Sequence, residues 1–529
     1  MSQQWIIVYL LIACAHLSYQ RSTPDAATYI AAVVEFPPQY LINSYQTLGV
    51  NSDTYIRHIK TASLNADIIV FPEDGLTTVH LPEREQMGDW TTVIPSASYN
   101  YTPCSQDTVE VSETLKKISC AARDNEIYVV INIAEKAPCT DVPCPRDKMF
   151  YYNSNVVFDR TGRIIARYRK TNLFEEHQFN VTSVPEIVTF DTDFGVKFGT
   201  FICFDILFRE PTIQLTRIHQ VTDFVYPTAW FSEAPFLTAA QTQAGWSFAE
   251  NVNLLASGYN RPGSGNAGSG IYLGRKGVGK AIMPETTHEE ILIVQVPKIK
   301  ERIKYHENHH DHSKDQNQKV RPSYHEEYEL QQKRQDNAMM VKDKILLKQD
   351  NIHVFQTHLL QKFSSVDSLS ICKDGFCCDA KVDIAKSDNT TYRFVVFNGI
   401  RDYSDVKAGV RACGIIQCSN DSISSCGSVE ESKTVFNSIE LTATFHDYKD
   451  SLIMPSTLNA DLLPLEGWTY DDHIHDDHMH VNMALINKNN LATFGVYARD
   501  FNRNNANRTS FYTINYTIVL LVTLLLSRL

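Results

Sequence analysis

The sequence predicts a layered α/β domain followed by a smaller β-rich domain that is cross-linked by disulfide bonds. Apolar strands alternate with helical patterns through about the first 300 residues, which is the signature of an α/β layer structure. From about residue 351 to 499 the chain changes to short strands, turn residues and six cysteines, a composition typical of a small disulfide-rich domain. The length of 529 residues also exceeds that of one ordinary domain.

The α/β region begins with an apolar strand and continues as an alternating series. The stretch 28–36 is rich in Ala, Val and Ile, and 66–71 is a second buried run that stops at Pro72. Hydrophobic periodicity predicts helices at 51–65, 109–125, 212–220 and 239–253. It predicts further strands at 127–134, 151–158, 163–168, 196–202, 223–226, 254–258 and 290–296. The glycine-rich stretch 262–270 lacks dinucleotide and Walker spacing, so we favour a flexible loop over a phosphate cradle.

Changes in composition divide the chain into five segments. We expect a signal peptide at 1–20, the α/β domain at 28–297, a polar His-rich linker at 298–345, the β-rich domain at 346–500 and a tail at 501–529. Within the linker, residues 301–337 are nearly free of aliphatic residues, which favours a solvated segment over a folded one.

Both ends of the chain resemble targeting signals. Residues 1–20 hold an apolar run and a small-x-small step, as in a cleaved secretory signal, although basic residues are lacking before the run. A retained anchor is the alternative, for which the run is short. The tail places small residues near Asn505, then a polar stretch and an apolar end, the order of a glycosylphosphatidylinositol attachment signal. We therefore expect a protein of the secretory pathway, lipid-anchored at the cell surface or extracellular.

Charge and histidine content exclude some partners and leave others open. The net charge of −12 argues against nucleic-acid binding, which needs a basic surface. Two His-rich stretches could hold a metal, but we favour a plain polar tract for the linker and an exposed acidic loop for the second. The second stretch contains His473, His475, His478 and His480.

The cysteine count singles out one residue. Twelve cysteines are present, and Cys14 would leave with the signal peptide. Of the other eleven, four precede residue 145, six follow residue 371, and Cys203 stands alone between the groups. An odd count in an oxidising compartment points to one free thiol or an intermolecular bridge. We expect Cys203 to be the free thiol and leave the pairing of the rest open.

Asn-x-Ser/Thr sequons mark candidate glycosylation sites on a secreted protein. The plausible acceptors are Asn100, Asn180, Asn389 and Asn420, and two further sequons lie in the tail.

Three reactive side chains each follow a predicted strand: Glu73, Lys170 and Cys203. Strands of one sheet that end at one edge would bring them together. A thiol is largely protonated at neutral pH, so a carboxylate is needed to take its proton and an ammonium to favour the thiolate and a developing oxyanion. The backbone N–H of Phe204 could supply a second oxyanion donor. The competing interpretation is a buried core cysteine and two solvated charges.

Sequence motifs around these residues resemble the nitrilase, or carbon–nitrogen hydrolase, superfamily. The three motifs are FPEDG (71–75), YRKTNLF (168–174) and FICFDILFREP (201–211). Longer runs are similar to the vanin and biotinidase branch, at 179–195, 227–231, 268–272 and 372–378. The resemblance implies a four-layer αββα sandwich, here with a second, β-rich domain.

The same resemblance implies roles for the site residues. Glu73 would be the proton acceptor, Lys170 the proton donor and oxyanion partner, and Cys203 the nucleophile. A second carboxylate of the family falls on Glu176, although Glu175 stands where many relatives have glycine and the loop is one residue shorter.

The function implied is hydrolysis of a linear amide through a cysteine thioester, without a metal or organic cofactor. Pantetheine, cleaved to pantothenate and cysteamine, is the expected small-molecule substrate. Biotinyl amides are the alternative within the class, and a non-catalytic cell-surface glycoprotein on the same scaffold is the alternative outside it. We expect the lipid anchor to provide membrane attachment, and the oligomeric state, a monomer included, stays open.

Overall fold

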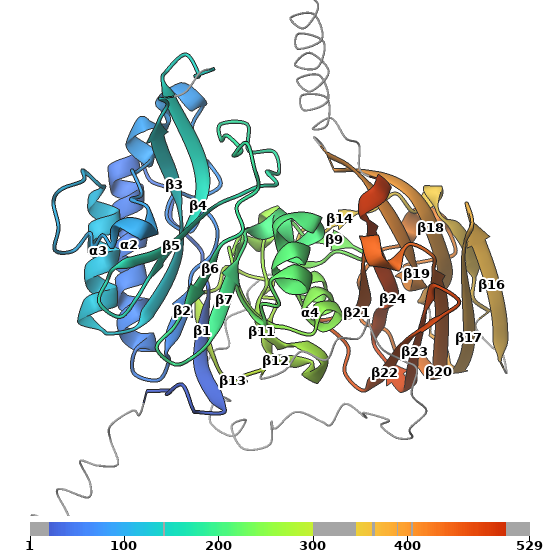
Figure 1. Ribbon diagram of the computed structural model, residues 1–529. Helices are drawn as coiled ribbons and strands as arrows, with labels where there is room; N and C mark the ends of the chain where they lie inside the picture. The colour runs from blue at the N-terminus through green and yellow to red at the C-terminus, as the bar shows by residue number, and fades with distance from the viewer. Residues whose placement is uncertain are drawn as a thin grey trace, which may run out of the picture.

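A computed structural model describes residues 21–140, 143–299, 345–361, 366–388, 390–403 and 406–503. The predicted signal peptide, nearly all of the His-rich linker, Asn389 and the region near Asn505 lie outside the described residues. Two folded parts follow one another along the chain, an α/β part and an all-β part (Figure 1). In the described part of the chain, no helix is both long and apolar enough to cross a membrane.

The first sheet of the α/β part has the strand order β13-β1-β2-β3-β4-β5. Its strands are β1 (Thr28–Glu35), β2 (Ile68–Val70), β3 (Tyr128–Pro138), β4 (Met149–Phe158), β5 (Ile164–Arg169) and β13 (Glu290–Pro297). Helices α2 (Ser44–Ala62) and α3 (Glu113–Asp124) cover its outer face (Figure 1). Alternate residues of β1 divide between the two faces: Ala32 and Val34 pack in the helix-side core, whereas Ala31 and Val33 pack in the core between the sheets.

The second sheet has the order β12-β11-β10-β8-β7-β6 and packs against the first. Its strands are β6 (Thr189–Asp191), β7 (Lys197–Thr200), β8 (Asp223–Thr228), β10 (Asn253–Gly258), β11 (Ser269–Leu273) and β12 (Val278–Ile282). Helix α4 (Ala239–Glu250) and the π-helical segment η4 (Arg209–Ile218) belong to the layer outside this sheet. Two helical layers therefore enclose two sheets, which confirms the predicted αββα class.

Capping side chains explain where the first helices begin. The side chain of Asn43 accepts a hydrogen bond from the Gln46 N–H, so α2 starts seven residues before the predicted position 51. Ser112 caps α3 in the same way through the Leu115 N–H, so this helix starts at Glu113 rather than at 109. Polar caps thus override the apolar pattern at helix starts.

The glycine-rich stretch 262–270 is not simply the flexible loop that we expected, because strand β11 begins within it at Ser269. The glycines permit close backbone packing: a Cβ on Gly258 would lie 2.4 Å from the carbonyl oxygen of Gly268. Glycine here marks close approach of chain segments.

The all-β part is a sandwich of two five-stranded sheets, with the orders β15-β18-β19-β24-β21 and β16-β17-β20-β23-β22. The strands are β15 (Gln356–Leu359), β16 (Asp367–Lys373), β17 (Phe376–Lys386), β18 (Thr391–Tyr403), β19 (Val406–Cys418), β20 (Val435–Phe445), β21 (Ser451–Asn459), β22 (Trp468–His475), β23 (His478–Asn489) and β24 (Leu491–Asp500). The second His-rich stretch is not the predicted loop. It forms the paired strands β22 and β23, with His473 opposite His480.

Disulfide bonds pair ten of the eleven described cysteines. The pairs are Cys104–Cys120, Cys139–Cys144, Cys372–Cys377, Cys378–Cys413 and Cys418–Cys426. The Cys378–Cys413 bond joins β17 to β19 and so connects the two sheets of the all-β part. Cys203 carries a free thiol, as the odd count predicts.

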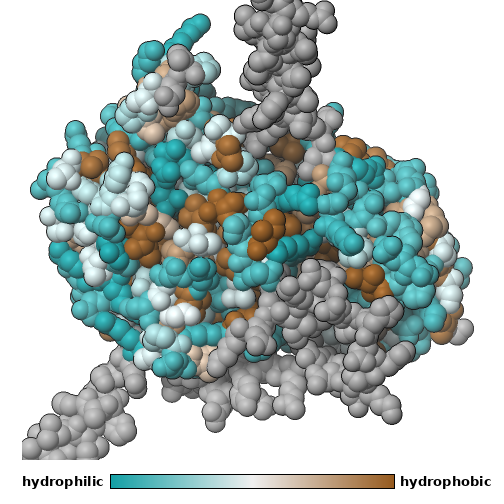
Figure 2. Space-filling view, in the orientation of Figure 1, coloured by the Kyte–Doolittle hydropathy of each residue, from teal (hydrophilic) through white to brown (hydrophobic). Residues whose placement is uncertain are grey.

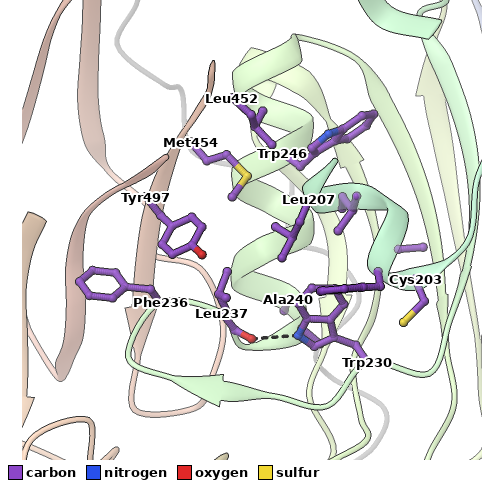
Figure 3. Packing of buried hydrophobic residues seen from close by; sticks show 14 of the residues in the cluster. Cys203, Leu207, Trp230, Phe236, Leu237, Ala240, Trp246, Leu452, Met454 and Tyr497 are labelled. Atoms are coloured by element: carbon purple, nitrogen blue, oxygen red, sulfur yellow. Dashed lines mark hydrogen bonds between the residues drawn. The ribbon is translucent and has the colours of Figure 1, made fainter. Parts of the chain in front are cut away.

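The two parts share one continuous apolar core (Figure 3). Leu452, Met454 and Tyr497 of the all-β part belong to the same cluster as Leu207 and Trp246 of the α/β part. Short strands β9 (Glu233–Ala234) and β14 (Lys348–Gln349) add a parallel pairing across the junction. Figure 2 shows a mainly hydrophilic surface, with apolar residues gathered near the centre of this view. The all-β part is therefore packed against the α/β part rather than tethered beside it.

Candidate active site

Cys203 begins a tight turn that follows β7. The turn, Cys203–Leu207, is a buried 3₁₀ segment, and residue Cys203 as a whole is 7% exposed. Its φ of 44° lies in the left-handed region, which costs a non-glycine residue about 1–3 kcal/mol and persists only where the surroundings enforce it. The Ile202 N–H donates to Asp205 Oδ2 at 3.0 Å, and the Tyr226 hydroxyl donates to the Cys203 carbonyl at 2.9 Å. These bonds hold the cysteine in its strained conformation.

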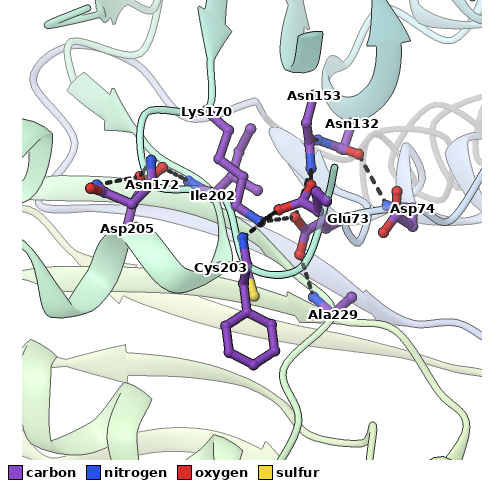
Figure 4. Close-up of polar contacts among 12 residues, drawn as sticks. Glu73, Asp74, Asn132, Asn153, Lys170, Asn172, Ile202, Cys203, Asp205 and Ala229 are labelled. Carbon is purple, nitrogen blue, oxygen red and sulfur yellow. Dashed lines mark hydrogen bonds and ion pairs between the residues drawn. The ribbon is translucent and has the colours of Figure 1, made fainter. Parts of the chain in front are cut away.

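Glu73 and Lys170 form a buried ion pair beside this turn (Figure 4). Lys170 Nζ lies 2.6 Å from Glu73 Oε1, and both side chains are 2% exposed. The Glu73 carboxylate also accepts the Asn153 side-chain amide at 2.8 Å and the Ala229 N–H at 2.9 Å. Three donors therefore fix the carboxylate next to the thiol.

Glu176 completes this cluster as a second carboxylate on the same ammonium. Lys170 Nζ lies 2.5 Å from Glu176 Oε2, and Asn153 donates to Glu176 Oε1 at 2.6 Å. Glu175 adopts a φ of 55°, so the short loop turns sharply and aims the following residue inward. The loop length that departs from the family pattern still brings Glu176 to the lysine.

The three residues come from two sheets, so the expectation of one sheet edge is wrong. Glu73 follows β2 and Lys170 follows β5 in the first sheet, whereas Cys203 follows β7 in the second. The sequence shows strand ends but carries no direct signal of which strands share a sheet. The cluster therefore lies where two facing sheets end together.

The site carries one ammonium between two carboxylates and a protonated thiol. Burial raises the pKa of the Cys203 thiol well above its usual value, and the Glu73 carboxylate adds to this, while Lys170 opposes it. Burial would lower the pKa of Lys170, but the Glu176 and Glu73 carboxylates outweigh it and raise that pKa. Burial also raises the pKa of Glu176, against the opposing effect of Lys170. The thiol thus needs a base when a substrate arrives.

Sequence reasoning missed the amide side chains that support the carboxylates. Asn132 Nδ2 donates to Asn153 Oδ1 at 2.6 Å, and Asn153 in turn holds both Glu73 and Glu176. Asn132 also accepts the Asp74 N–H at 3.0 Å. Both asparagines lie in the buried part of a strand, and a polar amide in such a buried run is the signal that could have found them.

A narrow pocket of about 50 Å³ opens at Cys203. Aromatic and aliphatic side chains make most of its wall: Phe174, Phe204, Leu207, Trp230, Phe231 and Leu237. Tyr403 of β18, Glu233 of β9 and Lys348 of β14 complete it, with Lys348 Nζ 5.4 Å from the centres of both the Phe174 and Phe231 rings. Residues far along the chain therefore line the pocket, and no local motif marks them.

The remaining predicted site residues are Phe204, which lies next to Cys203, and the candidate glycosylation sites. Phe204 follows Cys203 within the turn, where its N–H was expected to donate to an oxyanion, and that role stays a prediction. Asn100 and Asn420 are exposed and Asn180 is half-buried. Their glycosylation also stays a prediction.

An αββα sandwich with a free thiol beside a buried carboxylate–ammonium pair has the form of a carbon–nitrogen hydrolase. Residues 27–251 match the model of the carbon–nitrogen hydrolase family, and residues 345–504 match that of the vanin C-terminal domain. Vanin-like protein 1 of Drosophila melanogaster is 35% identical over 533 residues, which cover 93% of this chain and 90% of the relative. The chain belongs to the vanin branch of the carbon–nitrogen hydrolase family.

Two further matches complete the comparisons with known proteins. The pantetheinase of Homo sapiens is 31% identical over 396 residues, covering 73% of this chain and 71% of the relative. A solved amidase from Nesterenkonia sp. aligns with a TM-score of 0.38 and 16% identity, over 53% of this chain and 94% of that one. The family makes the protein a hydrolase of non-peptide carbon–nitrogen bonds that acts on a small-molecule amide. The relatives and the five disulfides indicate an extracellular or cell-surface protein.

Proposed function

We propose that the chain hydrolyses pantetheine to pantothenate and cysteamine, with Cys203 as the nucleophile. The observation that carries this proposal is the free thiol at the base of a narrow pocket, beside the Glu73–Lys170 ion pair. The relatives named pantetheinase, at 31% to 40% identity, support the choice of amide.

The proposed reaction uses the thiol as it stands in the free enzyme. Glu73 takes the Cys203 proton as the sulfur attacks the amide carbonyl, and a carbon–sulfur bond forms. The oxyanion is held by the Lys170 ammonium and the Phe204 N–H. Glu73 then returns the proton to the departing amine, and the carbon–nitrogen bond breaks to leave a thioester.

A water molecule completes the proposed cycle. Glu73 takes a proton from this water as it attacks the thioester carbonyl, and the thiolate leaves and recovers a proton. The free acid is released. Glu176 keeps Lys170 charged throughout, because its carboxylate contacts the ammonium directly.

The pocket favours an unbranched chain at the scissile bond. Its volume of about 50 Å³ accommodates only the atoms next to that bond, so the rest of a linear amide must extend past the mouth. Apolar walls suit methylene groups on either side of the amide, and the Lys348 ammonium at the rim suits a carbonyl or hydroxyl oxygen further along. Pantetheine has this pattern, with linear methylene chains on both sides of its terminal amide.

Secretion and anchoring are part of the same proposal. We propose that residues 1–20 are removed as a signal peptide and that lipid is attached near Asn505. We also propose that Asn100, Asn180, Asn389 and Asn420 carry glycans. The exposure of Asn100 and Asn420 supports those two sites.

The test measures cysteamine release from pantetheine and biotin release from biotinyl-lysine, for the native chain and for Cys203→Ala. We expect cysteamine release by the native chain only. If the native chain releases biotin in preference to cysteamine, the substrate is a biotinyl amide rather than pantetheine. If both proteins release the same amount of product, Cys203 is not the nucleophile. If neither amide is cleaved, the result favours the alternative of a non-catalytic cell-surface glycoprotein.

A further inference from the structure

The far end of the nucleophile turn is bound by a residue almost three hundred positions away. Arg499 of β24 is fully buried, and its Nε donates to the carbonyl oxygen of Leu207, the last residue of the turn, at 3.0 Å. Its Nη1 donates to the Gly409 carbonyl of β19 at 2.5 Å. We propose that Arg499 is a positioning residue, through which the C-terminal domain holds Cys203 in its reactive conformation.

The turn is short enough to transmit this constraint. The Asp205 N–H donates to the Ile202 carbonyl and the Phe208 N–H to the Asp205 carbonyl, each at 3.0 Å. Leu207 is thus two residues beyond a carboxyl that itself holds the chain before Cys203. A shift at the Leu207 carbonyl would reach Cys203, whose left-handed φ needs external support.

Further contacts from the same domain reach the turn on other sides. The Tyr403 ring lies 5.6 Å from that of Phe204, and the guanidinium of Arg499 lies 5.4 Å from the Phe208 ring. Beyond the turn, Arg209 forms a half-exposed ion pair of 2.6 Å with Asp450. Arg499 differs from Tyr403 and Asp450 because it is a buried charge bound to main-chain carbonyls, and removing it leaves the Leu207 oxygen without that donor.

A purely structural role for Arg499 makes a different prediction. If it only joined the domains, its replacement would lower the melting temperature without changing the chemistry of the thiol. If it positions Cys203, its replacement lets the turn relax toward solvent. The thiol then loses part of the burial that raises its pKa, while turnover falls because the sulfur no longer faces the amide correctly.

The test compares Arg499→Lys with Arg411→Lys in the full-length protein. Arg411 is a matched control, since it is a mostly buried arginine of the same domain whose ion pairs go to Asp447 and Asp500. For Arg499→Lys we expect kcat on pantetheine to fall about 10-fold with KM within about 2-fold, and the pH midpoint of Cys203 alkylation by iodoacetamide to move down. For Arg411→Lys we expect neither change. Unchanged kcat and midpoint in Arg499→Lys, or equal changes in both variants, would overturn the proposal.

Two features keep this test decisive. Alkylation needs no substrate, so it reports on Arg499 even if pantetheine is not turned over, although the proposal rests on the function proposed above. If Arg499→Lys does not fold, Arg499→Gln is the second variant, because its side-chain amide can still donate to a main-chain carbonyl such as that of Leu207. A fall in kcat together with a lowered alkylation midpoint supports the proposal, and unchanged kcat and midpoint contradict it.

Discussion

Glu73 and Lys170 lie on one sheet of the sandwich and Cys203 on the other, and different forces hold the two sides. On the first sheet, charges and amides fix one another: Lys170 contacts Glu73 and Glu176, and Asn153 bonds to both carboxylates. On the second sheet, the Cys203 turn is held by hydrogen bonds between its main chain and the side chains of Asp205 and Tyr226, by aromatic packing and by Arg499 of the other domain.

This difference separates two tasks. Electrostatic contacts govern the side that carries Glu73 and Lys170, whereas packing sets the position of Cys203. Substitutions on the first sheet should therefore change the chemistry with little change in shape. Those on the second should act through geometry.

The largest effect is expected from Glu73→Gln. It removes the proposed base, so kcat on pantetheine should fall by about 10³-fold. The Glu73 carboxylate also raises the pKa of Cys203, so its loss should lower that pKa and make alkylation at a fixed pH near neutrality faster. Steady-state kinetics and the pH profile of iodoacetamide labelling measure the two effects.

Opposite directions for turnover and labelling are the signature of this variant. The exposed Glu83→Gln serves as control and should change neither quantity. A Glu73→Gln enzyme that labels more slowly would mean that the carboxylate acts on Cys203 by some route other than charge.

A smaller effect is expected from Glu176→Gln. This change leaves Lys170 with Glu73 as its remaining carboxylate in the cluster, so Glu73, the proposed proton acceptor, is drawn more strongly to the ammonium. We expect kcat to fall by about 10- to 100-fold with KM nearly unchanged. Glu175→Gln is the matched control, because it alters the exposed neighbour in the same loop. Equal kinetics of the two variants would show that Glu176 does not contribute to turnover.

The sequence predicted those parts of the site whose signals are local. Glu73, Lys170 and Cys203 were found because each follows an apolar strand, and the odd cysteine count identified the thiol. The αββα class followed from the alternating pattern together with the motif resemblance.

Other parts depend on contacts that no local pattern records. The division of Glu73 and Cys203 between two sheets depends on strand order, and the inward turn of Glu176 depends on the backbone at Glu175. Arg499 bonds to Leu207 across 292 residues. A strand-like stretch near the C-terminus gives no sign that one of its arginines reaches the Cys203 turn.

A last comparison sets Glu73 against Glu35, a second buried carboxyl at the end of a strand in the same sheet. Glu73 contacts an ammonium. Glu35 is bonded instead to neutral donors, the Asn260 amide, the Ser269 hydroxyl and the Gly268 N–H. Burial therefore raises the pKa of Glu35 to about 7, although these donors oppose the shift.

A carboxyl whose pKa is raised on folding stabilises the protein below its unfolded pKa of 4.5, and this contribution is lost as the pH rises toward 7. Glu35→Gln lacks this titration. The unfolding free energy of the variant minus that of the native chain should therefore increase as the pH rises from 4.5 to 7. The full shift corresponds to at most about 3 kcal/mol. Denaturant unfolding of both proteins at pH 4.5, 5.5 and 7 measures it. A constant difference would show that Glu35 stays ionised in the fold, and that neutral donors alone can hold a buried carboxylate here as the ammonium holds Glu73.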